Sequence, residues 1–366
     1  MKNFATNKEF LTSISNRLTK EYDFIIVGQG LAGTCLASEL IDRGKKVLLF
    51  DSPVMPSSSE VAGGLFNPVT GRNMVLTWKW NLLFPFLKRF YSNLEQKLGA
   101  KFIHDLPLYR PFANNKELNE WQGRSAEDRY KPIIDFISTE PYRPEYVMNL
   151  FGGIMLKQAG YLDARLFLAH FRTLLGEKEA LIEDQFMPEN INFNPNSVVY
   201  NEYSARKLIF CDGPIGFGNK LLKEIRFHPL KGEVLQIEID FESDFILNRN
   251  AFVLPRDGYF VAGSNYDLKD TSWEPTSKGK KEIEDKIDKI LNKDYKIISH
   301  RAGLRPTTHD RRPVLGLLPA YPQIGVFNGL GTKGVSLAPY FANQFASFLV
   351  NGTVIEQEVN VDRFFN

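Results

Sequence analysis

The stretch Asp23-Phe-Ile-Ile-Val-Gly28-Gln-Gly30-Leu-Ala-Gly33 near the start of the chain indicates a strand that turns directly into a helix. Its apolar run is of strand type, and the apolar residues after Gly30 repeat at helical spacing as far as Gly44. Between them lies the pattern GxGxxG, which in this context favours a bound dinucleotide. The alternative is a glycine turn of an α/β protein that binds no ligand.

Each position of this pattern has its own task in a dinucleotide site. Gly28 allows the tight turn, Gly30 lets the backbone approach a pyrophosphate, and Gly33 lets the helix pack against the strand. The first helical residues, Leu31 and Ala32, would offer unpaired N–H groups at the positive end of the helix dipole.

An acidic residue ends the next predicted strand, Val47–Phe50. Asp51 follows Gly30 by about 20 residues, the spacing of a carboxylate that accepts hydrogen bonds from an adenosine ribose. We therefore place Asp51 and its neighbour Ser52 in the predicted nucleotide site.

Length and composition indicate a globular protein with more than one core. The chain has 366 residues, 43% of them hydrophobic, which suggests two domains. Lysine and arginine total 45 against 43 acidic residues, and a net charge of +2 gives no field that favours nucleic acid or an anionic membrane. The two cysteines, Cys35 and Cys211, lack CxxC spacing and are expected to be buried, reduced thiols.

No stretch resembles a targeting or membrane-spanning segment. The polar N-terminus lacks the apolar core of a signal peptide, and no run reaches the roughly 18 apolar residues of a membrane span. We expect a cytoplasmic protein.

Three segments after the first unit differ in composition. Ser57–Gly71 is rich in small residues and can lie against a flat ligand. Trp78–Leu98 has aromatic and aliphatic residues at helical spacing, interrupted by Pro85, and is expected to form a pair of core-packing helices. The alternative is a docking face for a membrane or a partner. Phe112–Tyr146 is polar and punctuated by prolines, so we expect loops and short elements rather than a core.

The second half of the chain predicts further strands. Lys207–Cys211 predicts a buried strand that leads to a glycine turn at Gly213. Runs between Glu233 and Ser264, with a turn at Asp257-Gly258, predict an antiparallel sheet.

A second glycine pattern, Gly329-Leu-Gly331-Thr-Lys-Gly334, follows a strand candidate and precedes an apolar helix, Val335–Leu349. This order of elements predicts an α/β fold in which a discontinuous, Rossmann-like nucleotide-binding domain holds an inserted α+β substrate domain with an antiparallel sheet. The predicted nucleotide-binding segments are 20–78, 150–225 and 303–366, and the predicted substrate-domain segments are 79–149 and 226–302.

On these residues the chain resembles the superfamily of FAD-dependent oxidoreductases that includes D-amino-acid oxidase, glycine oxidase and sarcosine oxidase. The resemblance covers nearly the whole chain. It is carried by Asp23–Gly33 with Asp51, and by the later blocks Ala62–Pro68, Leu230–Gln236, Val253–Gly263, Ala302–Gly316 and Gly329–Pro339.

The resemblance implies that FAD is the cofactor, bound non-covalently because no cysteine lies where sarcosine-type members tether it. It also implies that the second glycine turn and its helix point amide groups at the pyrimidine edge of the flavin. Lys333 would be a nearby cation that stabilises the negative charge of the reduced ring; the alternative is a solvated lysine at a helix start. The residues implied to contact FAD are Gly28, Gly30, Leu31, Ala32, Gly33, Asp51, Ser52, Gly63, Gly64, Leu65, Gly213, Arg305, Gly329, Gly331, Thr332, Lys333 and Gly334.

Arg305 matches the family arginine that binds the substrate carboxylate, a task suited to a planar, bidentate guanidinium. The alternative for Arg305 is a structural ion pair with Asp310 or Glu233.

One position departs from the family. Phe252 stands where its amino-acid oxidases have a tyrosine directed at the same carboxylate. Tyr259 or Tyr266 could supply the missing hydroxyl, and the implied catalytic residues are Arg305, Tyr259 and Lys333.

The implied reaction removes a hydride from a C–H bond next to the nitrogen of a small amine or amino acid, with flavin N5 as acceptor and reoxidation by oxygen or another acceptor. No metal is expected, because none of the five histidines has metal-ligand spacing. Two alternatives stay open. One is a dehydrogenase of a hydroxy acid or polyol phosphate that passes electrons to quinone, with Trp78–Phe90 docked at a membrane. The other is the oxidative component of a tRNA-modifying system, although the near-neutral charge argues against autonomous RNA binding.

Overall fold

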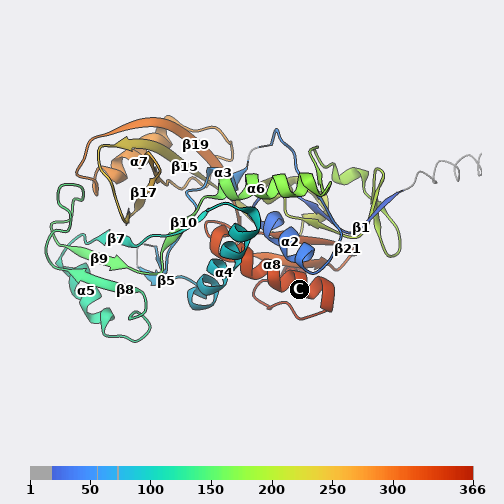
Figure 1. Ribbon diagram of the computed structural model, residues 1–366, viewed down its shortest axis with the longest axis horizontal. Coiled ribbons are helices and arrows are strands. Elements are labelled where there is room, and N and C mark those ends of the chain that lie inside the picture. The colour runs from blue at the N-terminus through green and yellow to red at the C-terminus, as the bar shows by residue number, and fades with distance from the viewer. Residues whose placement is uncertain (1–18, 56, 72–73, 366) are drawn as a thin grey trace, which may run out of the picture.

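The computed structural model describes residues 19–55, 57–71 and 74–365. Figure 1 shows an elongated molecule in which one sheet, flanked by helices, lies toward one end and a second sheet toward the other. Each of these two sheets has eight strands. The predicted fold class, a Rossmann-like sheet joined to a mainly antiparallel one, is confirmed.

The first sheet is built on the strand that carries the first glycine pattern. β1 (Lys20–Val27) pairs in parallel with β2 (Val47–Phe50) and β14 (Tyr203–Phe210), and β14 pairs in parallel with β21 (Tyr321–Asn328). Strands covered on both faces need continuous apolar runs, and all of β2 is buried. The remaining strands are β11 (Leu181–Ile182), β12 (Asn192–Phe193), β13 (Val198–Tyr200) and β20 (Val314–Leu318).

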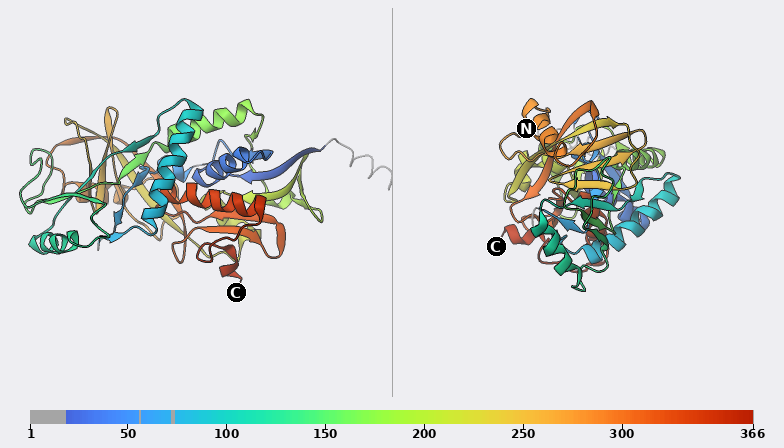
Figure 2. Two further views of the ribbon diagram at one scale, coloured as in Figure 1. Left: turned by 60° about the horizontal axis from the view of Figure 1, so that its bottom comes forward. Right: turned by 90° about the vertical axis from the view of Figure 1, so that its left-hand side faces the viewer.

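Helices from both ends of the chain pack beside this sheet in one core. α2 (Leu31–Asp42) and α8 (Gly334–Asn351) lie side by side, as Figures 1 and 2 show. α4 (Trp80–Leu98) and α6 (Ala164–Glu177) complete the layer.

The segment expected to form two helices is a single one. α4 continues through Pro85, because the loss of one backbone hydrogen bond is outweighed by the burial of an apolar face. Its Tyr91 hydroxyl donates to the Val335 carbonyl of α8 at 3.2 Å. The helix therefore packs internally, and the docking-face alternative is wrong for its buried side chains, which are Leu83, Phe84, Leu87, Phe90, Tyr91 and Leu94.

The second sheet has the strand order β19-β15-β18-β17-β16-β7-β9-β8. Only β16 and β7 pair in parallel among these described strands. The β17–β18 hairpin turns at Asp257-Gly258 as predicted, with Gly258 at φ 77°. The strands are β7 (Leu108–Pro111), β8 (Ile134–Ser138), β9 (Gly153–Leu156), β15 (Phe227–Ile239), β16 (Ile246–Arg249), β17 (Ala251–Arg256), β18 (Tyr259–Gly263) and β19 (Tyr295–Thr308).

Two helices accompany the second sheet. α7 (Ser277–Ile287) buries Ile283 and Ile287 in a core on one face. α5 (Asn115–Ser125) lies in the segment expected to lack a core, and that expectation is wrong. The buried ring of Trp121 gathers the sparse apolar residues of this segment into a local core, a cluster too irregular to show periodicity in the sequence.

Short strands join the two large sheets. β3 (Leu65–Phe66), β10 (Gly160–Leu162) and β6 (Ile103–Asp105) form one small sheet, and β4 (Val69–Thr70) pairs with β5 (Val75–Leu76). The division of the chain into the two expected domains stays a prediction. None of the helices in the described ranges is long and apolar enough to cross a membrane.

Candidate active site

A cavity of about 1940 Å³ is lined by residues from both large sheets and from early, middle and late parts of the chain. It brings together most of the residues that the sequence placed in the site. Of those, Gly33, Gly329 and Tyr259 do not line it. The predicted residues that do are Gly28, Gly30, Leu31, Ala32, Asp51, Ser52, Gly63, Gly64, Leu65, Gly213, Arg305, Gly331, Thr332, Lys333 and Gly334.

Two glycines of the first pattern are required by the chain itself. A Cβ atom on Gly33 would lie 1.9 Å from the carbonyl oxygen of Gly28, and one on Gly28, at φ 99°, would lie 2.7 Å from the carbonyl oxygen of Cys211. Gly33 therefore serves the close approach of helix and strand, which explains its absence from the cavity wall.

Gly30 is different, because the chain leaves room beside it. A Cβ atom there would meet only the Ser59 hydroxyl, at 3.2 Å. Gly30 is also the N-cap of α2 and provides no side-chain cap, while the Leu31 N–H, expected to be unpaired, donates to the Ser59 hydroxyl at 3.2 Å. The N-terminus of α2 still presents its positive partial charge to the cavity. This arrangement suits a pyrophosphate.

Asp51 directly follows β2, at the same edge of the first sheet as the turn from β1 into α2. One carboxylate oxygen accepts the Gln29 backbone N–H at 2.9 Å, and the other accepts Arg172 Nη1 at 2.8 Å. A carboxylate has about four lone-pair sites, so acceptor capacity is left for ribose hydroxyls. No sequence pattern predicts a role for Arg172, which reaches Asp51 only because α6 packs beside the first sheet.

The second glycine pattern places another helix N-terminus at the cavity. Gly331 donates its N–H to the Pro306 carbonyl at 2.8 Å, and α8 begins at Gly334 with no side-chain cap. A Cβ atom on Gly334 would lie 3.1 Å from a methyl carbon of Leu31 in α2. Two uncapped helix starts therefore lie next to each other.

Lys333 is partly buried at the start of α8. Its Nζ contacts the hydroxyls of Thr70 at 3.1 Å and Thr77 at 3.2 Å. Burial, with a smaller contribution from the charge of Arg312, lowers the pKa of Lys333 to about 8. These contacts do not fit the alternative of a freely solvated lysine.

Arg305 lies on β19 with its guanidinium inside the cavity wall. Nη2 donates to the Ser264 hydroxyl at 2.8 Å, and Nη1 donates to the Lys231 carbonyl at 3.2 Å. A Cβ atom on Gly232 would lie 1.9 Å from the guanidinium. Glycine at that position is therefore what makes room for the Arg305 head group.

The alternative ion-pair partners of Arg305 are occupied elsewhere. Asp310 pairs with Arg363 at 2.9 Å, and Glu233 lies 2.7 Å from His300 Nε2. No carboxylate in the described part of the chain lies within ion-pair distance of Arg305. Burial lowers the pKa of Arg305, but an arginine stays protonated at neutral pH.

Three aromatic residues considered as partners of Arg305 lie in different places. Phe252 lies against Gly63, where a Cβ atom would come within 2.7 Å of its ring. Tyr266 lines the cavity, and its ring centroid lies 4.8 Å from the Arg305 guanidinium carbon. Tyr259 begins β18 and precedes the cavity-lining Gly263 by about 13 Å of strand, so Tyr266, not Tyr259, stands beside the arginine.

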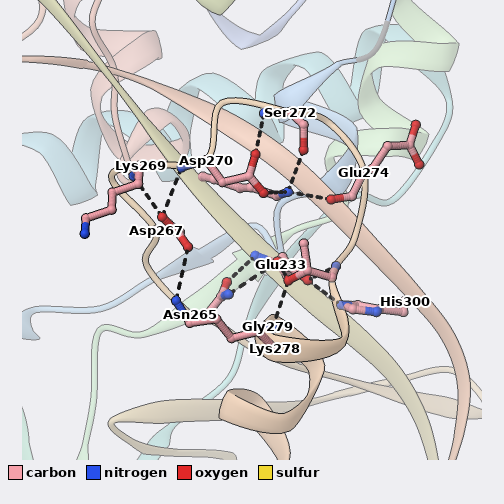
Figure 3. Close-up of polar contacts among 12 residues, drawn as sticks. Glu233, Asn265, Asp267, Lys269, Asp270, Ser272, Glu274, Lys278, Gly279 and His300 are labelled. Atoms are coloured by element: carbon pink, nitrogen blue, oxygen red, sulfur yellow. Dashed lines mark hydrogen bonds and ion pairs between the residues drawn. The ribbon is translucent and has the colours of Figure 1, made fainter.

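Polar contacts hold the loop that follows β18 and carries Tyr266, and Figure 3 shows those around Glu233, Asn265 and Asp270. The Asn265 side chain accepts the Glu233 backbone N–H at 2.7 Å, and Glu233 accepts the Thr276 backbone N–H at 2.9 Å. The fully buried Lys231 amine contacts Asp270 and donates to the Ser272 hydroxyl at 2.9 Å. Both ends of the loop are thus fixed to β15.

Neither cysteine resembles a reactive group. Cys35 and Cys211 are free and buried, and burial raises the pKa of both thiols. Within residues 19–55, 57–71 and 74–365, no group of three or more His, Cys, Asp or Glu side chains is placed to hold a metal ion.

Comparison with known proteins gives a consistent result. The family model described as "DAO: FAD dependent oxidoreductase" matches residues 23–347. The chain is 25% identical, over 88% of its length, to the tRNA 5-methylaminomethyl-2-thiouridine biosynthesis bifunctional protein MnmC of Marinobacter nauticus, and covers 54% of that protein. It is 26% identical, over 86% of its length, to the glycine oxidase of Pseudomonas aeruginosa and covers 91% of it. The chain thus spans about half of the first relative and most of the second.

Solved structures share the fold. Glycine oxidase from Geobacillus kaustophilus superimposes with a TM-score of 0.78 at 16% identity, covering 94% of this chain and 98% of that one. Iminodiacetate oxidase from Chelativorans sp. BNC1 gives a TM-score of 0.75 at 19% identity, covering 93% and 98%.

Proposed function

Because the chain belongs to the DAO family of FAD-dependent oxidoreductases, we propose that it oxidises a carbon–nitrogen bond in a small amine or amino acid that carries a carboxylate. The observation that carries this proposal is the Arg305 guanidinium, a half-buried cation that faces the cavity without a carboxylate partner among the described residues. Such a group calls for an anionic ligand.

The cavity fits the cofactor of the family. Gly30 and the start of α2 would hold the pyrophosphate, Asp51 the ribose, and Thr332–Gly334 with the Gly63–Leu65 loop would hold the flavin. The fit rests on the free space at Gly30 and on the two uncapped helix starts. When bound, FAD supplies a hydride acceptor at N5.

Arg305 would bind the substrate carboxylate and so hold the adjacent carbon in one orientation. Its contacts with Ser264 and the Lys231 carbonyl restrict the guanidinium before substrate arrives. The substrate nitrogen must be neutral for the adjacent C–H bond to give up a hydride, and the cations Arg305 and Lys333 of the cavity lower an amine pKa. No histidine lines the described cavity, so we assign no protein base to this step.

Glycine and N-substituted glycines are the substrates we propose first. Relatives in sequence and fold include glycine oxidases and an iminodiacetate oxidase. Iminodiacetate is glycine with a second carboxymethyl group on its nitrogen, so both names describe a carboxylate one carbon away from an amine. This is the geometry that one arginine beside a hydride acceptor would serve.

A second candidate is the same chemistry on a modified nucleoside. Several relatives are named for tRNA 5-methylaminomethyl-2-thiouridine biosynthesis, and the chain covers about half of each. Exposed Lys289 and Leu150 at the edge of the cavity leave it open toward a larger substrate. The quinone-linked dehydrogenase is less well supported, because Phe84 and Phe90 of α4 are buried and Trp80 and Phe86 pack against the same core.

Anaerobic reduction of the FAD-loaded protein tests the proposal. Glycine, sarcosine, iminodiacetate, a 2-hydroxy acid and glycerol phosphate are mixed with the enzyme, and flavin absorbance is followed. We expect reduction by the amino compounds and a loss of about 10- to 150-fold in kcat/KM for Arg305→Gln, the size expected for a lost charge-assisted contact. Arg301→Gln, outside the cavity, is the matched control. Reduction only by the hydroxy compounds would overturn the proposal.

A further inference from the structure

We propose that Arg110 forms a second anion site in the same cavity, and that the natural substrate carries a second anionic group, a carboxylate or a phosphate, at the end remote from its reacting nitrogen. This inference rests on the proposed function, in which Arg305 binds the first carboxylate. It adds a requirement that glycine itself does not meet.

Arg110 is a buried cation without a partner. It lies on β7, is 8% exposed and lines the cavity. Its Nε is buried and unpaired, and no hydrogen bond or ion pair of its guanidinium is found in the described part of the chain. Burial lowers the pKa of Arg110 to about 10, so the group is charged at neutral pH.

The nearest carboxylate is already engaged. Glu117 accepts Arg249 Nη2 at 3.4 Å and the Ala113 backbone N–H at 2.8 Å. Glu117 is therefore held by Arg249 and the backbone, and within the described residues it forms no ion pair with Arg110. None of the cavity-lining residues from the second sheet or α7 is acidic.

The strand register connects the two anion sites. Val234, Gly263, Phe252 and Asn248 pair in turn across β15, β18, β17 and β16. Continuing the parallel β16–β7 register by one residue places Asn248 beside Arg110. These residues line the cavity as one row.

The row also gives the distance that a substrate must span. The Arg305 guanidinium contacts Ser264 at the end of β18, and Arg110 lies three strands farther along. At the usual spacing of neighbouring strands this is about 14 Å. The side chains between them, Phe252 and Asn248, are uncharged, so an extended substrate with an anion at each end matches the wall.

An unpaired buried guanidinium destabilises a protein unless water or a ligand satisfies it. The planar fork of arginine suits the two oxygens of a carboxylate or a phosphate equally well. Arg110 therefore suits an anionic group with two oxygens, and the experiment below distinguishes a carboxylate from a phosphate.

The test uses the FAD-loaded enzyme and N-alkyl glycines whose alkyl chain ends in a carboxylate, a phosphate or a neutral amide. The linker is lengthened one methylene at a time, and kcat/KM is measured for each compound. We expect one linker length at which an anionic end raises kcat/KM about 10- to 100-fold over the amide. The better of the two anions identifies the natural source.

Arg110→Gln should abolish this preference and leave kcat/KM for the amide within about twofold. Arg110→Lys keeps the charge but loses the fork, so it should keep part of the preference and shows that loss in Arg110→Gln is not misfolding. Lys289→Gln removes an exposed charge near the same cavity and should keep the preference in full. An equal loss in Lys289→Gln, or an unchanged preference in Arg110→Gln, would overturn the site.

Binding of thioether analogues, with sulfur in place of the amine nitrogen, separates this inference from the proposed function. Their affinity is read from the flavin spectrum and needs no turnover. If no amine reduces the flavin but the doubly anionic thioethers still bind through Arg110, the anion site stands and amine oxidation fails. If amide-ended and anion-ended amines react equally well, amine oxidation stands and the site at Arg110 fails.

Discussion

The two ends of the cavity are built from different parts of the protein. The end at α2 and α8 is made of backbone: glycine turns and two uncapped helix starts offer N–H groups and partial charge. The end at the second sheet is made of side chains: Arg305 and Arg110 offer whole charges from separate strands. The first end is formed by residues that are consecutive in the sequence. The second end forms only after strands distant in the sequence have paired. Changes at the first should therefore act on cofactor retention and folding, and changes at the second on substrate selection.

The largest effect is expected for Gly33→Ala. The new Cβ would overlap the Gly28 carbonyl oxygen, and overpacking at such a contact costs about 3 kcal/mol. We expect loss of bound FAD and a lower unfolding temperature, measured by flavin absorbance and calorimetry. Gly123→Ala in α5, with open space around it, is the control and should be neutral or slightly stabilising. If the Gly33→Ala protein retained FAD, the assignment of this end of the cavity to cofactor binding and folding would be wrong.

Gly232→Ala should act on the other end of the cavity alone. The new Cβ would displace the Arg305 guanidinium, so we expect kcat/KM to fall about 100-fold while FAD content stays at the wild-type level. Both quantities are measured on the same preparation. A loss of flavin together with activity would mean that the two ends are not independent.

Lys333 precedes α8 at the first end of the cavity, and the pH dependence of its charge provides a further test. The ammonium is present below its pKa of about 8 and is lost as the pH rises through that value. We expect the substrate to reduce the flavin of the Lys333→Met protein about tenfold more slowly than that of the wild type at pH 7. The advantage of wild type should shrink above pH 8. Taking the ratio of the two rates removes the titration of the substrate amine, and a ratio independent of pH would contradict the assignment.

The smallest effect is expected for Arg172→Gln. This partly exposed arginine pairs with Asp51 at 2.8 Å, and pairs of this kind contribute up to about 1 kcal/mol. FAD should bind a few-fold more weakly with kcat unchanged, as measured by equilibrium dialysis. Arg206→Gln, which removes an exposed arginine 3.7 Å from Asp23, should leave FAD affinity unchanged.

The cofactor end could be predicted from local sequence because each requirement is local. The turn from β1 into α2, the tasks of Gly28 and Gly33, and the position of Asp51 after β2 all follow from neighbouring residues. The same reasoning failed at Pro85, where the packing of α4 overrides the local preference of proline.

The proposed substrate end could be predicted only where the family resemblance supplied a residue. Arg305 was found in that way, but Arg110 and Arg172 gave no signal, because an arginine on a strand or helix looks like a surface residue until its neighbours are known. Tyr259 and Tyr266 could not be separated either. Their difference depends on where β18 ends, and single-sequence patterns place strand ends poorly.

The pairing of β1 with β14 and of β14 with β21 joins segments that are more than 100 residues apart. On the ribosome, the N-terminal glycine turn is therefore made early, but α2 lacks its neighbour α8 until residues 334–351 have emerged. During that time one edge of β14 and part of the apolar side of α2 remain uncovered, and exposed surfaces of this kind are prone to aggregation. Cofactor uptake would then be among the last events of its maturation, after synthesis has passed residue 334.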